Sequence, residues 1–342
     1  MSYPLSALLP LWRRLSILLI ALLGFTASSC DDDEDTVTTD PQQNIVQVAQ
    51  SNPDFSILVA AVTKADLATT LSGAGPFTVL APTNAAFAQL GAPFNSAANI
   101  NAIPAGDPRI ATLRNILLYH VLAGRVAAAD FPTGPSAQLT QKPASASGVN
   151  DNMVYVSKTG TNVRLNGSSS VLTPDVAASN GIIHAIDRVL MPPAGKISDI
   201  VVASATASPA QFTLLLQALQ RPAAAALLTA AANPASNLTV FAPTDAAFQA
   251  LLTQLNLTSL SQVPDATLVA VLQLHIVGSR AFSSDLSSGT VTTLGGPVTV
   301  GVNGSSVTVR GNGNGTANAN VTTANILASN GVIHVLDRVL LP

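Results

Sequence analysis

The chain reads Phe77-Thr-Val-Leu-Ala-Pro-Thr-Asn-Ala-Ala-Phe87 and, 161 positions later, Leu238-Thr-Val-Phe-Ala-Pro-Thr-Asp-Ala-Ala-Phe248. Two further segments on the C-terminal side of this stretch also occur twice. They are Leu117-Leu-Tyr-His120 with Leu272-Gln-Leu-His275, and Ser179–Pro192 with Ser329–Pro342. The three pairs keep the same order along the chain, which indicates that one unit has been duplicated.

The repeated unit has the size of a whole domain. Its offset falls from 161 positions at the first segment to 150 at the last, which is too long for a solenoid repeat and typical of a domain. We therefore predict two tandem domains, residues 44–193 and 196–342. The residues Pro192–Gly195 between them form a short, stiff junction, because proline restricts its own backbone and that of its predecessor.

The first repeated segment predicts a strand that runs directly into a helix. Thr78–Leu80 favours β structure, and the next residues carry side-chain oxygens that accept hydrogen bonds from free helix N–H groups. These helix-capping residues are Thr83 and Asn84 in the first repeat and Thr244 and Asp245 in the second.

The four histidines of the chain all lie in repeated segments. His120 and His275 each end an apolar stripe with helical spacing, and His184 lies in a predicted buried strand, residues 182–190. On a strand, His184 and Asp187 project from opposite faces, so they do not form a local metal or proton-relay pair. We interpret the histidines as hydrogen-bonded core residues, with two identical ligand sites as the alternative.

Two glycine-containing segments carry further predictions. Asn180-Gly181 is suited to a turn with positive φ at the entry to the last strand of the first repeat. The run Gly311–Gly315 lacks the aspartates of calcium-binding glycine repeats, so a flexible hairpin tip is favoured over a metal site.

The three repeated segments together resemble the fasciclin domain, with its Thr-Val-Phe-Ala-Pro-Thr-Asp/Asn box, its central Tyr-His element and its closing Asn-Gly-x-Ile-His-x-Ile-Asp box. The resemblance implies an α+β fold in which helices pack around a β-wedge or sandwich, and a role in adhesion or matrix contact. The family motif residues that it assigns a structural role are Thr83, Asn84, Tyr119, His120, His184, Asp187, Thr244, Asp245, His275, His334 and Asp337. Neither domain has the Asp-Ile pair that accompanies Tyr-His in integrin-binding members, so that role is not carried over.

The N-terminus is predicted to be a targeting signal. Arg13 and Arg14 precede an apolar run, residues 15–25, which small residues and Cys30 follow. The run would rise only about 16 Å as a helix, too little to cross a bilayer. This order resembles a bacterial lipoprotein signal, so we predict a signal peptide over residues 1–29, lipidation of Cys30 and an outer-membrane, surface-exposed location.

The acidic run Asp31–Asp35 follows the predicted lipidation site. Clustered like charges repel one another and stay in water, so residues 30–43 are predicted to be a disordered tether. The run also resembles an export signal of surface lipoproteins, and the two interpretations are compatible.

Composition argues against several classes of function. No glutamate occurs after Glu34, so a zinc helix of the His-Glu-x-x-His type and a glutamate glycosidase pair are excluded. The chain has one cysteine and no nucleotide-binding loop or nucleophile elbow. Acids and bases balance beyond residue 35, without a basic patch for nucleic acid. We therefore predict no enzymatic activity, no cofactor and no bound metal.

Three functions remain as hypotheses. The first is a surface adhesion or matrix-binding lipoprotein, whose partner is a protein or glycan of the matrix or of a neighbouring cell, with the membrane bound through Cys30. The second is a lipoprotein that binds a small ligand or glycan for uptake, which an enlarged apolar pocket with converging polar groups would favour. The third, an extracellular hydrolase, would need a deep cleft with aspartates close together.

Overall fold

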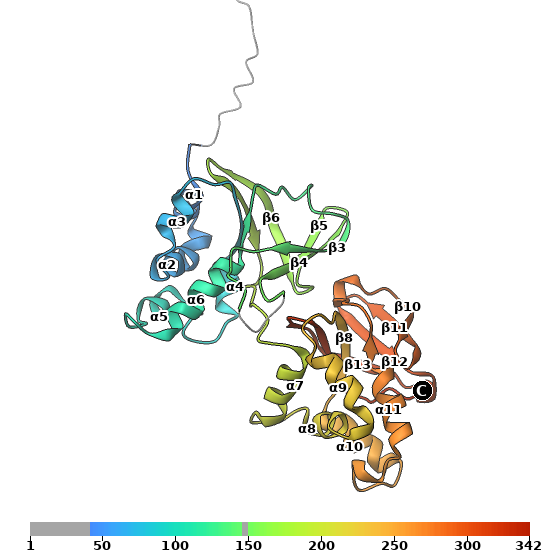
Figure 1. Ribbon diagram of the computed structural model, residues 1–342. Coiled ribbons are helices and arrows are strands. Elements are labelled where there is room, and N and C mark those ends of the chain that lie inside the picture. Colours follow the sequence, from blue (N-terminus) through green and yellow to red (C-terminus); the bar gives the residue numbers. More distant parts are fainter. Residues whose placement is uncertain (1–41, 146–149) are drawn as a thin grey trace, which may run out of the picture. The chain divides into compact units, whose positions relative to one another are not determined.

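Each repeat folds into a set of helices packed against one seven-stranded sheet (Figure 1). The computed structural model describes residues 42–145 and 150–342. Both repeats mix helices with strands, so the prediction of two tandem α+β units is confirmed. We call the first unit domain 1 and the second domain 2.

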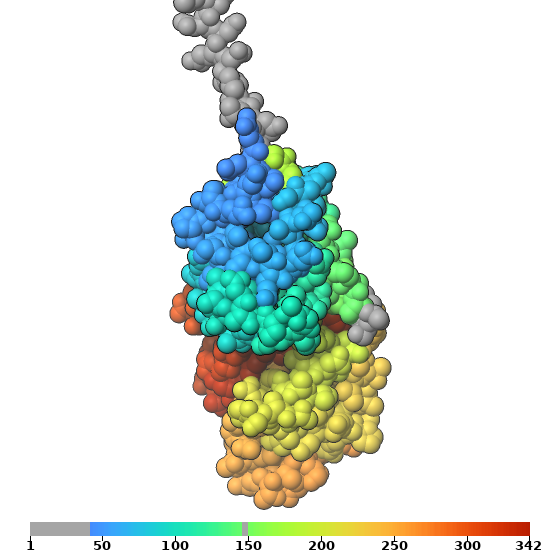
Figure 2. Space-filling model, turned by 90° about the vertical axis from the view of Figure 1, so that its left-hand side faces the viewer, coloured from blue at the N-terminus to red at the C-terminus, as the bar shows by residue number. Residues whose placement is uncertain are grey.

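Within the described residues, domain 1 has three helices before its first strand β1 and three between β1 and β2. These are α1 (Ile45–Ser51), α2 (Ser56–Lys64), α3 (Ala68–Ser72), α4 (Asn84–Ala88), α5 (Ala97–Asn101) and α6 (Pro108–Tyr119). Its strands are β1 (Phe77–Pro82), β2 (Val121–Ala123), β3 (Gly134–Leu139), β4 (Met153–Thr159), β5 (Asn162–Leu165), β6 (Ser169–Ala178) and β7 (Gly181–Ile186). On the face in Figure 2, most of the visible surface of domain 1 comes from the helical residues, blue to cyan.

Domain 2 repeats this order. Its helices are α7 (Ile197–Thr206), α8 (Thr213–Leu219), α9 (Ala225–Ala232), α10 (Asp245–Gln254) and α11 (Asp265–Leu274). Its strands are β8 (Leu238–Pro243), β9 (Ile276–Val277), β10 (Gly289–Thr293), β11 (Gly296–Asn303), β12 (Ser306–Arg310), β13 (Ala319–Ala328) and β14 (Gly331–Leu336). Short 3-10 turns are η1 (Pro53–Phe55), η2 (Pro222–Ala224), η3 (Leu260–Gln262), η4 (Ser283–Asp285) and η5 (Asn312–Asn314).

The two sheets share one topology. The strand order is β2-β1-β7-β6-β5-β4-β3 in domain 1 and β9-β8-β14-β13-β12-β11-β10 in domain 2. Only the central pairs, β1 with β7 and β8 with β14, are parallel, and all the other pairs are antiparallel. A bridge between Leu122 and Thr140 brings the two ends of the first sheet together, so that it curls towards a closed barrel.

The central strands are buried on both faces. Every residue of β7 and of β14 is buried, as the long apolar run of each closing segment predicts. Each domain therefore has two clusters of core residues. One cluster packs between the helices and the sheet, around Phe87 in domain 1, and the other fills the inside of the curled sheet, around Tyr119. Domain 2 has the same two clusters, around Phe248 and Phe241.

The predicted helix caps are confirmed. The Thr83 hydroxyl accepts a hydrogen bond from the N–H of Ala86 at 3.3 Å, and the Thr244 hydroxyl accepts from Ala247 at 3.2 Å. Asn84 and Asp245 begin helices α4 and α10 and also tie them to the preceding helical segment. Asn84 accepts from the N–H of Ile57 at 2.9 Å, and Asp245 accepts from Leu214 at 2.7 Å.

Two predictions at the end of domain 1 are wrong. The last strand ends at Ile186, and not at residue 190. Neither Asn180 nor Gly181 has a positive φ. Gly181 is required for a different reason, because a Cβ atom there would lie 2.1 Å from the carbonyl oxygen of Phe77. The Asn180 amide instead fixes the neighbouring loop by donating to Leu71 and Gly73, at 2.8 Å each.

The predicted flexible hairpin tip at Gly311–Gly315 is also wrong. This segment joins β12 to β13 and lies under the last residues of the chain. The Asn314 side chain accepts from the N–H of Leu341 at 2.9 Å and donates to the Val339 carbonyl at 2.9 Å. A Cβ on Gly311 would lie 2.2 Å from the Leu341 carbonyl oxygen, so the glycines permit close backbone packing.

No single helix within residues 42–145 and 150–342 is long and apolar enough to cross a bilayer. Only residues 213–219 and 222–232 reach that length and composition together, with a bend of 81° between them. The predicted signal peptide, Cys30 and nearly all of the tether lie outside the described residues. The described residues all belong to one unit, residues 40–342, within which side chains of domain 2 contact domain 1.

Candidate functional site at the domain seam

His120 and His275 lie buried at the ends of α6 and α11. In each ring Nε2 accepts a backbone N–H, from Leu190 at 2.8 Å and from Leu340 at 2.9 Å. The proton is therefore on Nδ1, which donates to the carbonyl four residues earlier at 2.7 Å. Burial lowers the pKa of both histidines to about 4. Each neutral ring joins the central helix of its domain to the residues that follow the last strand.

His184 and His334 form a second equivalent pair, in which each ring joins two backbone segments of its domain by hydrogen bonds. The Nδ1 of His184 accepts from the N–H of Asp175 at 3.1 Å, and its Nε2 lies 2.9 Å from the Val126 carbonyl. His334 does the same with Asn325 and Ala281, at 3.4 and 3.0 Å. Burial lowers the pKa of His334.

Asp187 and Asp337 form equivalent hydrogen bonds to strands β6 and β13. Asp187 accepts from the N–H of Ser170 at 2.7 Å, and Asp337 accepts from the N–H of Asn320 at 2.7 Å. Neither carboxylate contacts the histidine three residues before it. The motif residues therefore do not meet at a common site, and within the described residues no three histidine, aspartate or glutamate side chains gather as a metal site would require.

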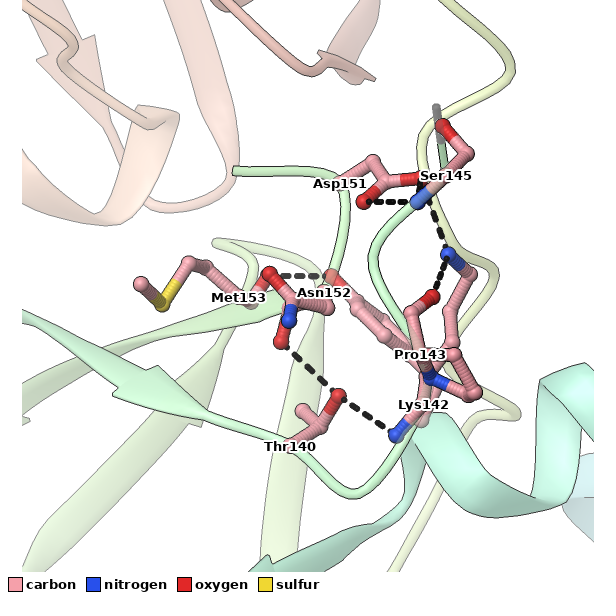
Figure 3. A network of polar contacts seen from close by, with 8 residues as sticks. Thr140, Lys142, Pro143, Ser145, Asp151, Asn152 and Met153 are labelled. Carbon is pink, nitrogen blue, oxygen red and sulfur yellow. Dashed lines mark hydrogen bonds and ion pairs between the residues drawn. The ribbon is translucent and has the colours of Figure 1, made fainter. Parts of the chain in front are cut away.

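Figure 3 shows a network of polar contacts around Lys142 and Asp151 in domain 1. A second polar side chain of domain 1 is the buried Tyr119, which domain 2 replaces by Leu274. Its hydroxyl donates to the Met153 carbonyl at 2.5 Å, and burial raises its pKa. In the same loop region, Lys142 Nζ lies 2.9 Å from a carboxylate oxygen of Asp151. Burial alone would raise the pKa of Asp151, but hydrogen bonds from Lys142 and Ser145 bring it below its ordinary value. The charges of Lys142 and Asp151 neutralise each other, so this ion pair offers no net charge to a ligand.

The two domains meet through an arginine and two aromatic rings. The guanidinium of Arg280 lies 4.1 Å from the centre of the Tyr155 ring, and the rings of Tyr155 and Phe282 are 5.7 Å apart. Arg280 is held in place by the carbonyls of Ala328 and Gly331, at 2.9 and 2.8 Å. Such a cation–π contact contributes about 0.5–2 kcal/mol.

A close backbone approach completes the seam. The amide of Asn325 donates to the Gly167 carbonyl at 3.0 Å, and Ser157 donates to the Asp285 carboxylate. Gly167 has a φ of +67°, and a Cβ there would lie 2.5 Å from the Cβ of Phe282. Only glycine fits both the conformation and the space.

An open groove of about 590 Å³ lies beside these contacts. Eleven of its lining side chains carry hydroxyl, amide or guanidinium groups, against six aliphatic ones. Domain 1 contributes residues of β4, β5 and β6, and domain 2 contributes residues around Ser283, Ser305 and Asn325. Its volume lies in the usual range for ligand sites, so we take this groove as the candidate functional site.

The sequence did not predict the groove. Arg280 had a detectable signal, because it follows His275 at the same distance as Arg125 follows His120. Tyr155 had none, because the hairpin of domain 2 places Thr299 at the corresponding position. Residues that contact each other only at the seam between the two domains have no counterpart in the other repeat, so comparison of the repeats does not reveal them.

Comparison with known proteins agrees with the fold. A family model for the fasciclin domain matches residues 53–192 and 210–342. The protein sll1483 of Synechocystis is 42% identical over 155 residues, a match that covers 45% of this chain and 77% of that protein. The transforming growth factor-beta-induced protein ig-h3 of Sus scrofa is 32% identical over 162 residues, which cover 47% of this chain but 21% of ig-h3.

A solved pair of such domains, from the insect cell adhesion molecule Fasciclin I, aligns over 83% of this chain and 92% of its own, with 20% identity and a TM-score of 0.36. The family model alone spans well over half of the chain, in two successive matches. The chain therefore belongs to the fasciclin domain family and carries two fasciclin domains in tandem.

Proposed function

We propose that this protein is a non-catalytic surface protein of the adhesion type, which binds a glycan or protein of its surroundings in the groove at the domain seam. The observation that carries this proposal is the contrast between the groove and the motif residues. The histidines and aspartates of the repeated boxes are used in hydrogen bonds inside each domain, whereas exposed polar side chains such as Arg164, Arg188 and Ser305 line an open space of about 590 Å³.

The alternative, uptake of a small apolar ligand, has less support. The apolar cavity of domain 1 lies between α1, α2 and the sheet, where Ile45, Leu58 and Val62 are among its lining residues. Its volume is about 30 Å³, roughly the share of one water molecule in the liquid. Within the described residues, no three histidine, aspartate or glutamate side chains gather as the metal site of a hydrolase would require.

We further propose that the protein is anchored to a bacterial outer membrane by a lipid on Cys30 and faces the outside. The support is the order of the first 35 residues: two arginines, an apolar run, small residues, the single cysteine of the chain and five acids. An acyl chain contributes about 0.8 kcal/mol of membrane affinity per buried methylene. The acids keep the segment that follows the lipid in water.

The binding proposal is tested with an array of extracellular glycans and matrix proteins probed with the purified chain. We expect retention of one partner class. A Ser305→Trp variant, which narrows the groove from an exposed turn, should lose this retention, whereas the matched variant Ser261→Trp on η3 should keep it. Equal retention by both variants would move the binding site away from the groove, and no retention by the wild type would remove the adhesion proposal.

The anchor is tested separately in cells. Cys30→Ala should release the protein from the membrane fraction or leave it uncleaved, without changing either domain. Substitution of Asp31–Asp35 by Ser or Asn should leave the lipid in place and reduce cleavage by protease added to whole cells. Wild-type protein that incorporates no labelled palmitate would refute the lipoprotein assignment.

A further inference from the structure

One wall of the groove is a row of polar side chains that crosses three strands of domain 1. Ser157 of β4 pairs with Arg164 of β5, and Arg164 pairs with Ser170 of β6. Directly paired residues of neighbouring strands project from the same face of a sheet. Val163 and Leu165, on either side of Arg164, are buried, so this row lies on the outer face of the curled sheet.

Two arginines of this wall have a free positive charge. Arg164 lies in the row, and Arg188 follows Asp187, whose backbone N–H donates to the carbonyl of Ser170 at 3.2 Å. Both arginines line the groove and are exposed. Neither belongs to any of the ion pairs found in residues 42–145 and 150–342. Arginine presents a planar fork of donors that matches a carboxylate or sulfate group.

The opposite wall offers neutral donors and acceptors. Ser283 and Ser284 come from η4, and Ser305 comes from the turn between β11 and β12. Asn325 is fixed there, because its side chain accepts from the N–H of Ser283 at 2.8 Å and donates to the Ser283 hydroxyl at 2.7 Å. This wall therefore holds hydrogen-bonding groups in defined positions.

Two acids lie beside the groove. Asp187 accepts from the N–H of Ser170 at 2.7 Å and from the Ser169 hydroxyl at 3.1 Å. The carboxylate of Asp285 accepts hydrogen bonds from the Ser157 hydroxyl, from the N–H of Phe282 at 3.0 Å and from the Ser284 hydroxyl at 3.3 Å. It is thus engaged by three donors of the protein and does not pair with Arg164 or Arg188. Both acids are hydrogen-bonded to groups of the protein, and neither forms an ion pair with Arg164 or Arg188 in the part of the chain that the structure describes.

We propose that the groove binds an acidic oligosaccharide, whose carboxylate or sulfate groups pair with Arg164 and Arg188 while its hydroxyls bond to the serine and asparagine side chains of the opposite wall. This proposal rests on the proposed binding function and names its ligand class. A sugar fits the chemistry, because its many hydroxyls both donate and accept hydrogen bonds, as the lining side chains do.

A peptide fits the groove less well. The domain 1 wall is built from β4, β5 and β6, of which β5 is paired on both sides and β4 and β6 are each paired with two neighbours. At Arg164 and Leu165 β5 is paired with both neighbours, so no free strand edge is offered there for the backbone of a peptide. The side chains that line the wall are mostly short and polar, and lack the apolar pockets that anchor peptide side chains.

The test is an array that carries uronic-acid and sulfated oligosaccharides beside their neutral counterparts, together with oligoglutamate peptides. We expect binding to acidic saccharides, weakened as salt is added, and little binding to neutral ones. The double variant R164Q/R188Q should raise the Kd for the acidic saccharide at least about tenfold, because both charge-assisted pairs with its acidic groups are lost. The matched variant R109Q removes an exposed arginine on α6 and should leave the Kd unchanged.

The outcomes separate the two proposals. No retention of any glycan or protein overturns the binding function itself. Three other results overturn only the acidic-saccharide inference and leave the binding function standing. They are retention of a partner without any preference for acidic saccharides, binding of oligoglutamate that is equal or tighter, and a Kd that R164Q/R188Q does not change. Because both arginines are exposed, the double variant should unfold at the same temperature as the wild type, which shows that any loss is one of recognition.

Discussion

At the scale of single residues, the buried histidines make the protein sensitive to acid. His120 and His275 have a folded-state pKa of about 4, whereas an unfolded histidine has a pKa near 6.5. Between these values the unfolded chain binds more protons than the folded one, so the free energy of unfolding falls as the pH is lowered through this window. Above about pH 6.5 the titration of these two histidines no longer affects the free energy of unfolding.

We expect each of these two histidines to remove about 3 kcal/mol between pH 7 and pH 4. Urea unfolding at a series of pH values measures this slope. In the variant His120→Gln, the pH dependence of the free energy of unfolding should lose the contribution of His120, and the stability of domain 2 should not change. An identical slope in wild type and variant would mean that His120 does not carry the effect.

At the scale of elements, the pairing of β1 with β7 depends on the small volume of Gly181. A methyl group there would lie 2.1 Å from the Phe77 carbonyl oxygen and 2.8 Å from the Ile45 side chain. Gly181→Ala should therefore destabilise domain 1 by about 1–3 kcal/mol, as overpacking does. Gly91→Ala is the control, because nothing lies within 4 Å of a Cβ at that position. Equal urea midpoints for the two variants would contradict the prediction.

The ion pair in the loop between β3 and β4 should show a strong asymmetry between single and double replacement. Lys142→Met leaves the carboxylate of Asp151 buried without its cation, which typically costs about 3–5 kcal/mol. Lys142→Met with Asp151→Leu removes both charges and should recover most of that loss. Thermal unfolding of the two variants measures the difference, and a double variant less stable than the single one would show that the charges themselves stabilise the loop.

The sequence predicted those elements that local chemistry specifies. Thr83 and Thr244 cap their helices as their side chains require, and the apolar closing segments form the buried β7 and β14. The sequence-based predictions were wrong where a residue is required by a contact with a distant part of the chain. Gly181 and Gly311 are glycines because another backbone passes close to them, and no local pattern tells such a glycine from one in a turn. The groove was out of reach for the same reason, because Arg164 and Ser305 meet across two domains.

At the scale of the whole molecule, each domain has its own two core clusters, and the groups that pack across the seam are few, the buried Phe282 and the partly buried Leu327 among them. We expect fragments 44–193 and 196–342 each to unfold cooperatively on their own. The seam contacts should make the joined chain more stable than the fragments by about 1–3 kcal/mol, since the Phe282 ring is buried there and Arg280 lies over Tyr155. Calorimetry of both fragments and of the chain checks this, and two fragments that fold only when mixed would refute the domain boundary.

The pairing of Phe77 with Gly181, and of Leu238 with Gly331, also governs when each domain can form. The central strand of a domain finds its partner only after nearly the whole domain has been synthesised, since the closing strand comes last in the sequence. Such distant pairing makes folding slow, on the order of milliseconds to seconds, because the entropy of a long loop is lost before the contacts are gained. Each domain is therefore completed only after its last strand has been synthesised, so the proposed export across a membrane would meet a chain whose growing domain is still unfolded.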